Sequence, residues 1–322
     1  MPTIVLSNHY TSAPLSIITE VLPTGFDLVN LTEASREELL KEAKHADYIL
    51  ASGRLKIDAL VLDAAPRLKM IQRTGVGLDA IDLDVLRARD IPLYVNQGVN
   101  SDSVAEHTLM LILATLRRLP TVHEEIKSGI WIKQGNGVRN RELKGKTVGI
   151  IGMGHIGRRV AELLIGFGVK IVYNDVHRMP SDMEDRLGAE YMSFDSLLGC
   201  SDIITMHCPL SEASRNLIGS CALSKVRRGC IIVNTARGGL IDEAALAAAL
   251  NDGTVFGAGL DVFPAEPIDS ASPLLKCENV VLTPHIGGVT YDSFKRMMSE
   301  AMSNIACFES GEISRIENRR YI

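Results

Sequence analysis

A glycine-rich segment in the middle of the chain has the spacing of a phosphate-binding turn. It follows the apolar run Val148–Ile151, precedes a segment of helical periodicity, and reads Gly152-Met153-Gly154-His155-Ile156-Gly157. The first glycine of such a segment permits a tight turn, the second lets the backbone approach a pyrophosphate, and the third lets the helix pack against the strand. The N–H groups at the start of the helix then attract phosphate oxygens. The segment therefore predicts a dinucleotide site.

An acidic residue lies where the ribose of such a dinucleotide would bind. Lys170–Tyr173 reads as a second strand that ends at Asn174-Asp175, about twenty residues beyond the turn. The carboxylate of Asp175 would accept hydrogen bonds from the ribose hydroxyls and repel a 2′-phosphate, which favours NAD over NADP. His177 and Arg178 follow closely and are able to hold a phosphate, so NADP stays open as an alternative. Without the glycines, Asp175 would read as a solvated acid at a strand end.

Three further predicted strands end in residues that could move a proton and hold an anion. Ile231–Thr235 leads to Arg237, Ala258–Phe263 leads to Glu266, and Val280–Thr283 leads to His285. Histidine is suited to proton transfer near neutral pH, a carboxylate can orient it, and arginine binds a carboxylate with two parallel hydrogen bonds. Each residue alone has an ordinary structural explanation. Together, behind a dinucleotide turn, they predict hydride transfer at an oxygen-bearing carbon.

The elements that must position these residues alternate between strand and helix. Strand-like segments occur at Thr3–Leu6, Phe26–Val29, Tyr48–Ala51, Lys69–Gln72 and Pro92–Val95, and a capped helix starts at Ser35. This alternation is typical of a parallel sheet covered on both faces. From Thr147 it resumes and runs to Thr283. The fold class that we predict is therefore α/β, with two doubly wound parallel-sheet domains.

The position of the glycine turn predicts that one domain is inserted into the other. We place a nucleotide-binding domain at 101–289 and a substrate-binding domain at 1–100 plus 290–322, closed by one long helix from Val289 to about Phe308. The inserted domain should open with a capping box at Ser103–Glu106, followed by an apolar helix at Thr108–Leu116.

Composition excludes several classes of function. The chain has 322 residues, 46% of them hydrophobic and 23% charged, with a formal net charge of -5, which argues against a general nucleic-acid-binding protein. We expect no secretory leader and no membrane span, and we predict no metal site. The six cysteines form no C-x-x-C pair and are expected to be reduced, mostly buried thiols. The expected location is the cytoplasm.

Four segments of the sequence resemble one enzyme family, that of the D-isomer-specific 2-hydroxyacid dehydrogenases, and within it the phosphoglycerate dehydrogenase-like members. The segments are Gly152–Asp175, Asn234–Gly239, Asp261–Pro267 and Thr283–Gly288. The resemblance implies two Rossmann-like domains, the NAD domain inserted into a flavodoxin-like substrate domain, and a homodimer. It implies Arg237 as the substrate-binding residue, Glu266 as partner and His285 as the acid/base.

The resemblance also assigns positions around the cofactor and the substrate. The amides of Gly75, Val76 and Gly77 would bind the substrate carboxylate, and a glycine-flanked turn after a strand is independently a plausible anion site. His155 and Ile156 would lie under the pyrophosphate, and Cys208 and Pro209 would form the adenine and ribose wall. The residues expected near the nicotinamide are Thr235, Ala236, Asp261 and Gly288.

The predicted function is NAD-dependent interconversion of a D-2-hydroxy acid and its 2-oxo acid. A formate-type dehydrogenase is disfavoured, because those enzymes carry glutamine where this chain has Glu266. An NAD-sensing, corepressor-like binding protein with the same three residues is the alternative from another functional class. The substrate side chain is left open between 3-phosphoglycerate, glyoxylate, hydroxypyruvate and bulkier acids, with Arg54 as either a second anion-binding group or a solvated cation. The helix Thr108–Leu116 and Trp131 are expected either to pack in the core of the chain or to form a dimer contact.

Overall fold

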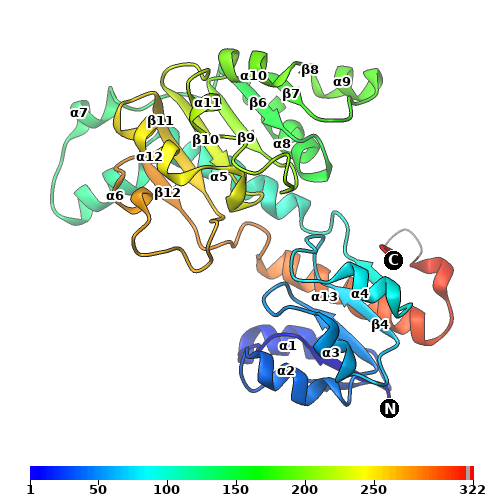
Figure 1. The fold of residues 1–322 in the computed structure, drawn as a ribbon. Helices are drawn as coiled ribbons and strands as arrows, with labels where there is room; N and C mark the ends of the chain where they lie inside the picture. The colour runs from blue at the N-terminus through cyan, green and yellow to red at the C-terminus, as the bar shows by residue number, and fades with distance from the viewer. Residues whose placement is uncertain (317–319) are drawn as a thin grey trace. The chain divides into compact units, whose positions relative to one another are not determined.

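The computed structural model describes residues 1–316 and 320–322, which divide into two compact units (Figure 1). One unit consists of Met1–Asn100 and Thr290–Ile322, and the other of Ser101–Val289. The second unit is therefore inserted into the sequence of the first.

The first unit is built on a sheet of five parallel strands in the order β2-β1-β3-β4-β5. This is the flavodoxin-like order of doubly wound folds. The strands are β1 (Thr3–Leu6), β2 (Asp27–Val29), β3 (Tyr48–Ala51), β4 (Met70–Arg73) and β5 (Leu93–Val95). All five predicted strands are confirmed to within one residue at each end.

Helices cover both faces of this sheet, because successive strand residues point to opposite sides. Ile4 and Leu6 pack with α1 (Ser12–Glu20) and α13 (Tyr291–Glu309), whereas Val5 packs with α2 (Arg36–Ala43), α3 (Ala59–Asp63) and α4 (Leu83–Ala88). Ser35 caps α2 by accepting a hydrogen bond from the amide of Glu38, as predicted. A short η3 (Ile313–Arg315) follows α13.

The long C-terminal helix α13 starts at a capping box formed by Thr290 and Ser293, and it confirms the predicted helix after Val289. Asn96 Nδ2 donates to the carbonyl of Met297 at 2.7 Å, and this bond is buried. The hydrogen bond ties the end of the first segment to the segment that returns after the insertion.

The second unit contains seven parallel strands in the order β12-β11-β10-β9-β6-β7-β8. The strands are β6 (Thr147–Ile151), β7 (Lys170–Asn174), β8 (Ala189–Tyr191), β9 (Ile203–Met206), β10 (Cys230–Asn234), β11 (Val255–Leu260) and β12 (Val280–Leu282). The order of the strands reverses between β6 and β9. Ligands of such sheets bind at this switch point, beyond the carboxyl ends of the strands.

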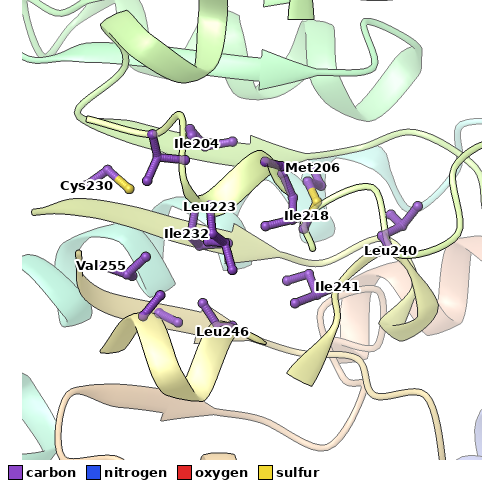
Figure 2. Packing of buried hydrophobic residues seen from close by; sticks show 14 of the residues in the cluster. Ile204, Met206, Ile218, Leu223, Cys230, Ile232, Leu240, Ile241, Leu246 and Val255 are labelled. Carbon is purple, nitrogen blue, oxygen red and sulfur yellow. The ribbon is translucent and has the colours of Figure 1, made fainter. Parts of the chain in front are cut away.

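Both faces of the seven-stranded sheet are buried under helices. Val148 and Ile150 of β6 pack toward α5 (Ser101–Leu116), α8 (His155–Ile165) and α9 (Ser181–Leu187). Ile204 of β9 and Ile232 of β10 pack on the other face, which Figure 2 shows with Leu223 and Leu246. The helices of that face are α10 (Phe194–Cys200), α11 (Ser220–Leu223) and α12 (Glu243–Asn251), with η1 (Gly238–Leu240) and η2 (Pro273–Lys276). The predicted fold class is confirmed.

One expected helix start is wrong. Helix α5 begins at Ser101, so Ser103 lies inside the helix and is not its N-cap. Its hydroxyl donates instead to the carbonyl of Gly287 at 2.8 Å. Ser103, whose spacing to Glu106 resembles a capping box, therefore makes a tertiary contact. Nine residues of α5 are buried, so the predicted apolar helix belongs to the core.

Two short helices, α6 (Leu119–Lys127) and α7 (Lys133–Gly137), follow α5 and contain no buried residue. All six cysteines are free thiols, three of them buried. Across the described part of the chain, every helix is too short or too polar to cross a bilayer.

Candidate active site and cofactor site

The glycine turn joins β6 to α8 at the switch point of the seven-stranded sheet. Gly152 has a φ of +93°, and a Cβ placed there would lie 2.6 Å from the backbone nitrogen of Cys208, just after β9. A Cβ on Gly157 would lie 2.1 Å from the carbonyl oxygen of Gly152. Both positions therefore require glycine, the first for its backbone conformation and both for close packing.

Gly154 has the opposite environment, because a Cβ placed there would meet nothing within 4 Å. It is the N-cap of α8 and has no side chain, so it leaves the first amides of the helix to an external anion. The backbone at Gly154 is exposed, and so is His155, while Ile156 is half-buried. Two closely packed glycines and one open glycine fit a diphosphate-binding turn.

The carboxylate of Asp175 stands at the end of β7 and faces this turn. Its Oδ2 accepts from the amide of Met153 at 2.6 Å, and its Oδ1 accepts from the amide of His177 at 2.9 Å. Each carboxylate oxygen has a second lone pair, so the group can still accept from two ribose hydroxyls. The two amide contacts fix the orientation of the carboxylate at the end of β7.

Arg178, which the sequence left open as a phosphate ligand, is bound to another group. Its Nε and Nη2 each donate to Glu184 at 2.9 Å, and Tyr173 Oη donates to the same carboxylate at 2.5 Å. Hydrogen bonds from Arg178 and then from Tyr173 lower the pKa of Glu184 to about 2, so the ion pair persists at neutral pH. Sequence reasoning missed Glu184, although its six-residue separation from Arg178 was visible.

The carboxyl end of β9 carries the predicted adenine-side wall. Cys208 is half-buried, Pro209 is exposed, and burial raises the pKa of the Cys208 thiol to about 11. The preceding His207 is held neutral, since burial lowers its pKa to about 3. This part of the site therefore presents an uncharged surface beside the turn.

The next strand, β10, ends in the Arg237 loop. Thr235 is buried and shares a hydrogen bond of 2.9 Å with Thr108 of α5, while the amide of Ala236 donates to Asn234 Oδ1 at 3.0 Å. Arg237 is half-buried, and its Nη1 donates to the carbonyl of Ala236 at 2.7 Å. These bonds set the direction in which the guanidinium leaves the strand.

A glycine holds the Arg237 loop against the loop that carries Glu266. A Cβ placed on Gly238 would lie 1.9 Å from the carbonyl carbon of Phe263, so only glycine permits this approach. The amide of Phe263 in turn donates to Glu266 Oε1 at 3.2 Å. The loops after β10 and β11 are therefore packed together at one edge of the sheet.

The structure brings Glu266 and His285 into direct contact. His285 Nδ1 lies 2.7 Å from Glu266 Oε2, and both side chains are partly open to solvent. An ionised carboxylate only accepts hydrogen bonds, so Nδ1 carries the hydrogen and Nε2 is left to exchange a proton. His285 has a φ of +56°, a left-handed backbone conformation that is rare outside glycine. Such conformations cluster at functional sites.

Asp261 is hydrogen-bonded to the backbone of the turn that carries His285. Asp261 is 1% exposed, and its carboxylate accepts from the amides of Ile286 at 3.0 Å and Gly287 at 2.8 Å. Gly288 is half-buried. The protein itself thus occupies much of the hydrogen-bonding capacity of Asp261.

The predicted carboxylate-binding loop belongs to the first unit, where it follows β4. Arg73 holds it by donating to the carbonyl of Gly77 at 2.8 Å and to Thr74 Oγ1 at 2.9 Å. Gly75 and Gly77 are half-buried, and Val76 is exposed. Within residues 1–316 and 320–322, no three His, Cys, Asp or Glu side chains gather as a metal site would require.

Comparison with known proteins identifies the family. The family model of the D-isomer specific 2-hydroxyacid dehydrogenase, NAD binding domain, matches residues 109–287. The chain belongs to this family. It is 42% identical to a glyoxylate reductase of Thermofilum pendens over 282 residues, which cover 87% of this chain and 83% of that protein.

Two other relatives are informative. A D-3-phosphoglycerate dehydrogenase of Mycobacterium bovis is 40% identical over 277 residues, but these cover 86% of this chain and only 52% of that protein. The structure of a D-lactate dehydrogenase from Aquifex aeolicus, complexed with NAD and lactic acid, is 29% identical with a TM-score of 0.85 and covers 99% of this chain and 98% of its own.

The family assignment settles the class of enzyme and its cofactor. The chain is an NAD-dependent D-2-hydroxyacid dehydrogenase, and the predicted resemblance is confirmed. The tight glycines, the open Gly154 and the carboxylate of Asp175 are the groups that would hold NAD. The roles of the individual site residues stay predictions, which we take up as proposals.

Proposed function

We propose that His285, Glu266 and Arg237 carry out the interconversion of a D-2-hydroxy acid and its 2-oxo acid. The 2.7 Å contact between His285 Nδ1 and Glu266 Oε2 is the observation that carries the proposal. It supports a histidine with one nitrogen fixed and the other available, at the carboxyl edge of the sheet that also bears the glycine turn.

In this mechanism His285 moves the proton and Glu266 orients it. In the direction of reduction, Nε2 of the protonated ring gives its proton to the substrate oxygen, and in oxidation the neutral ring takes that proton back. The carboxylate of Glu266 stabilises the positive charge of the imidazolium and keeps the hydrogen on Nδ1. NAD or NADH, when bound, would accept or supply the hydride.

Anion binding is assigned to Arg237 and to the loop of the first unit. A guanidinium matches a carboxylate in a bidentate geometry and polarises an adjacent carbonyl, which suits Arg237 to the 2-oxo acid group. The amides of Gly75, Val76 and Gly77 are the second proposed carboxylate-binding element, and the bonds of Arg73 support that role by fixing their loop. Thr235, Ala236 and Gly288 are proposed to line the nicotinamide.

The proposal is tested by following NADH and NADPH consumption with a panel of 2-oxo acids. The panel contains glyoxylate, hydroxypyruvate, its 3-phosphate, pyruvate and bulkier oxo acids. We expect NADH oxidation with at least one of the small acids. NADH binding without turnover on any acid of the panel would contradict the proposal.

We further propose that the protein is a homodimer that associates through the segment after α5. Six apolar side chains between Leu119 and Val138 are exposed, and Trp131 is 81% exposed. Isolated exposed apolar residues are common, but six within one short segment are typical of an interaction surface. They are Leu119, Ile126, Ile130, Trp131, Ile132 and Val138.

Trp131→Glu is therefore expected to convert the dimer into a monomer, because the carboxylate would lose its hydration in the interface. Sedimentation analysis measures the change. Trp131 is the only tryptophan of the chain, so its fluorescence should also shift to the red on dilution. Leu60→Glu, at an apolar residue that is 58% exposed in the first unit, is the matched control. A wild-type monomer, or a dimeric Trp131→Glu variant, would contradict the proposal.

A further inference from the structure

The turn Thr283–Gly287 must hold His285 in an unfavourable backbone conformation. The φ of His285 is +56°, and its amide donates to the carbonyls of Asp261 at 2.7 Å and Thr283 at 3.0 Å. A non-glycine residue persists in this region only when its surroundings impose it. The groups that hold the turn therefore fix where the imidazole stands.

The carboxylate of Asp261 accepts several hydrogen bonds from this turn. Besides two backbone amides of the turn, it accepts from Thr283 Oγ1 at 2.6 Å, and it lies 3.4 Å from His107 Nε2. Burial would raise the pKa of Asp261, but the nearby His107 and the hydrogen bonds from Thr283 and the two amides hold that pKa below its ordinary value. The buried group is thus ionised at neutral pH.

Two side chains of helix α5 are hydrogen-bonded to the same turn. Ser103 and His107 are four residues apart, so they lie on one face of the helix. Ser103 Oγ donates to the carbonyl of Gly287, and His107 Nε2 lies 2.9 Å from Thr283 Oγ1. A Cβ placed on Gly287 would be 2.8 Å from Asp261 Oδ2 and 3.3 Å from the His107 ring, so the absence of a side chain lets the turn approach both groups.

The donors and acceptors of this cluster fix the tautomer of His107. Thr283 has one hydroxyl hydrogen, and the 2.6 Å bond to the carboxylate of Asp261 uses it. Thr283 Oγ1 must then accept from His107, which places a hydrogen on Nε2. His107 is only 13% exposed, so water cannot readily replace this donor.

We infer that His107 is a positioning residue for the reaction: through Thr283 and Asp261 it holds the turn that presents His285 to Glu266. The inference rests on the proposed role of His285 as acid/base. The hydrogen bond that His107 donates keeps the Thr283 hydroxyl paired with the Asp261 carboxylate. Without this hydrogen bond, the turn with its left-handed residue is held less firmly. The His285 ring then loses its fixed distance from Glu266.

His107→Phe keeps a planar aromatic ring and removes the donor. We expect it to lower kcat about 10- to 100-fold, the usual cost of displacing a reacting group, while the Kd for NADH changes by less than about twofold. His107→Gln, whose amide can donate to the same hydroxyl, should recover most of kcat. The control is His45→Phe at an exposed histidine of the first unit. Wild-type kcat in His107→Phe, or no recovery with glutamine, would overturn the inference.

Two further variants separate this inference from the proposed function. Thr283→Val removes the bridging hydroxyl, so its loss of kcat should match that of His107→Phe, and the double variant should lose little more. Additive losses would overturn the inference. His107→Phe should have no further effect once His285 is alanine. If His285→Ala lowers kcat but His107→Phe does not, only the role of His107 fails; if His285→Ala retains normal kcat, both proposals fail.

Discussion

Replacing His285 by alanine is expected to lower the turnover of 2-oxo acids by at least ~100-fold, which is the usual contribution of a positioned general acid. Alanine leaves no group at the Nε2 position to give a proton to the developing alkoxide. NADH binding should be unchanged, because the glycine turn and Asp175 lie on other strands. Steady-state kinetics with the best acid of the panel, together with NADH titration by fluorescence, measures the two effects separately.

Two companion variants sharpen this test. Glu266→Gln keeps a hydrogen-bond acceptor for His285 Nδ1 but removes the charge, so its turnover should fall between those of the wild type and His285→Ala. His45→Ala removes an exposed histidine of the first unit and should have no effect. Near-normal turnover in His285→Ala would remove this residue from the acid/base role.

The sequence predicted those parts of the molecule that depend on local patterns. The alternation of strand and helix signals predicted both sheets, because a buried parallel strand is a short apolar run bounded by turns. Glu266 and His285 follow neighbouring strands β11 and β12, whose carboxyl ends must meet at one edge. The pairing of the two side chains was therefore predictable before any coordinates.

Contacts that depend on the packing of a helix against a loop were not predictable in this way. Ser103 was read as a helix cap because its spacing to Glu106 fits a capping box, whereas its hydroxyl bonds Gly287, 184 residues away in the sequence. His107 lies in the same helix, and nothing in its local pattern reveals that it faces Thr283. Arg178 was read as a possible phosphate ligand because the sequence does not show which way its side chain turns.

We propose that cofactor selection has two components, which can be separated by mutation. In this proposal Asp175 supplies the acceptor for a ribose and the repulsion of a 2′-phosphate, while the ion pair with Glu184 keeps Arg178 from serving as a phosphate ligand. With Asp175 alone, the nearby guanidinium of Arg178 would be free to bind the 2′-phosphate of NADPH. In this proposal the bidentate ion pair with Glu184 prevents that binding.

Asp175→Ala is expected to raise the KM for NADH and to reduce the preference for NADH over NADPH about 10- to 100-fold, since hydrogen bonds to a charged acceptor contribute about 1.5–3 kcal/mol. Adding Glu184→Gln should lower the KM for NADPH further, because the neutral amide releases Arg178 to the phosphate. The measurement is kcat/KM for both cofactors in each single variant and in the double variant.

Two controls separate charge from local structure. Asp175→Asn keeps an acceptor for one of the amides of Met153 and His177, so a loss seen in alanine but not in asparagine would reflect the turn and not the charge. Arg178→Ala in the double-variant background should abolish the gain with NADPH. If the preference is unchanged by Asp175→Ala, then Asp175 does not discriminate between the cofactors. If Glu184→Gln leaves NADPH kinetics unaltered in that background, the ion pair does not withhold Arg178, and the carboxylate of Asp175 acts alone.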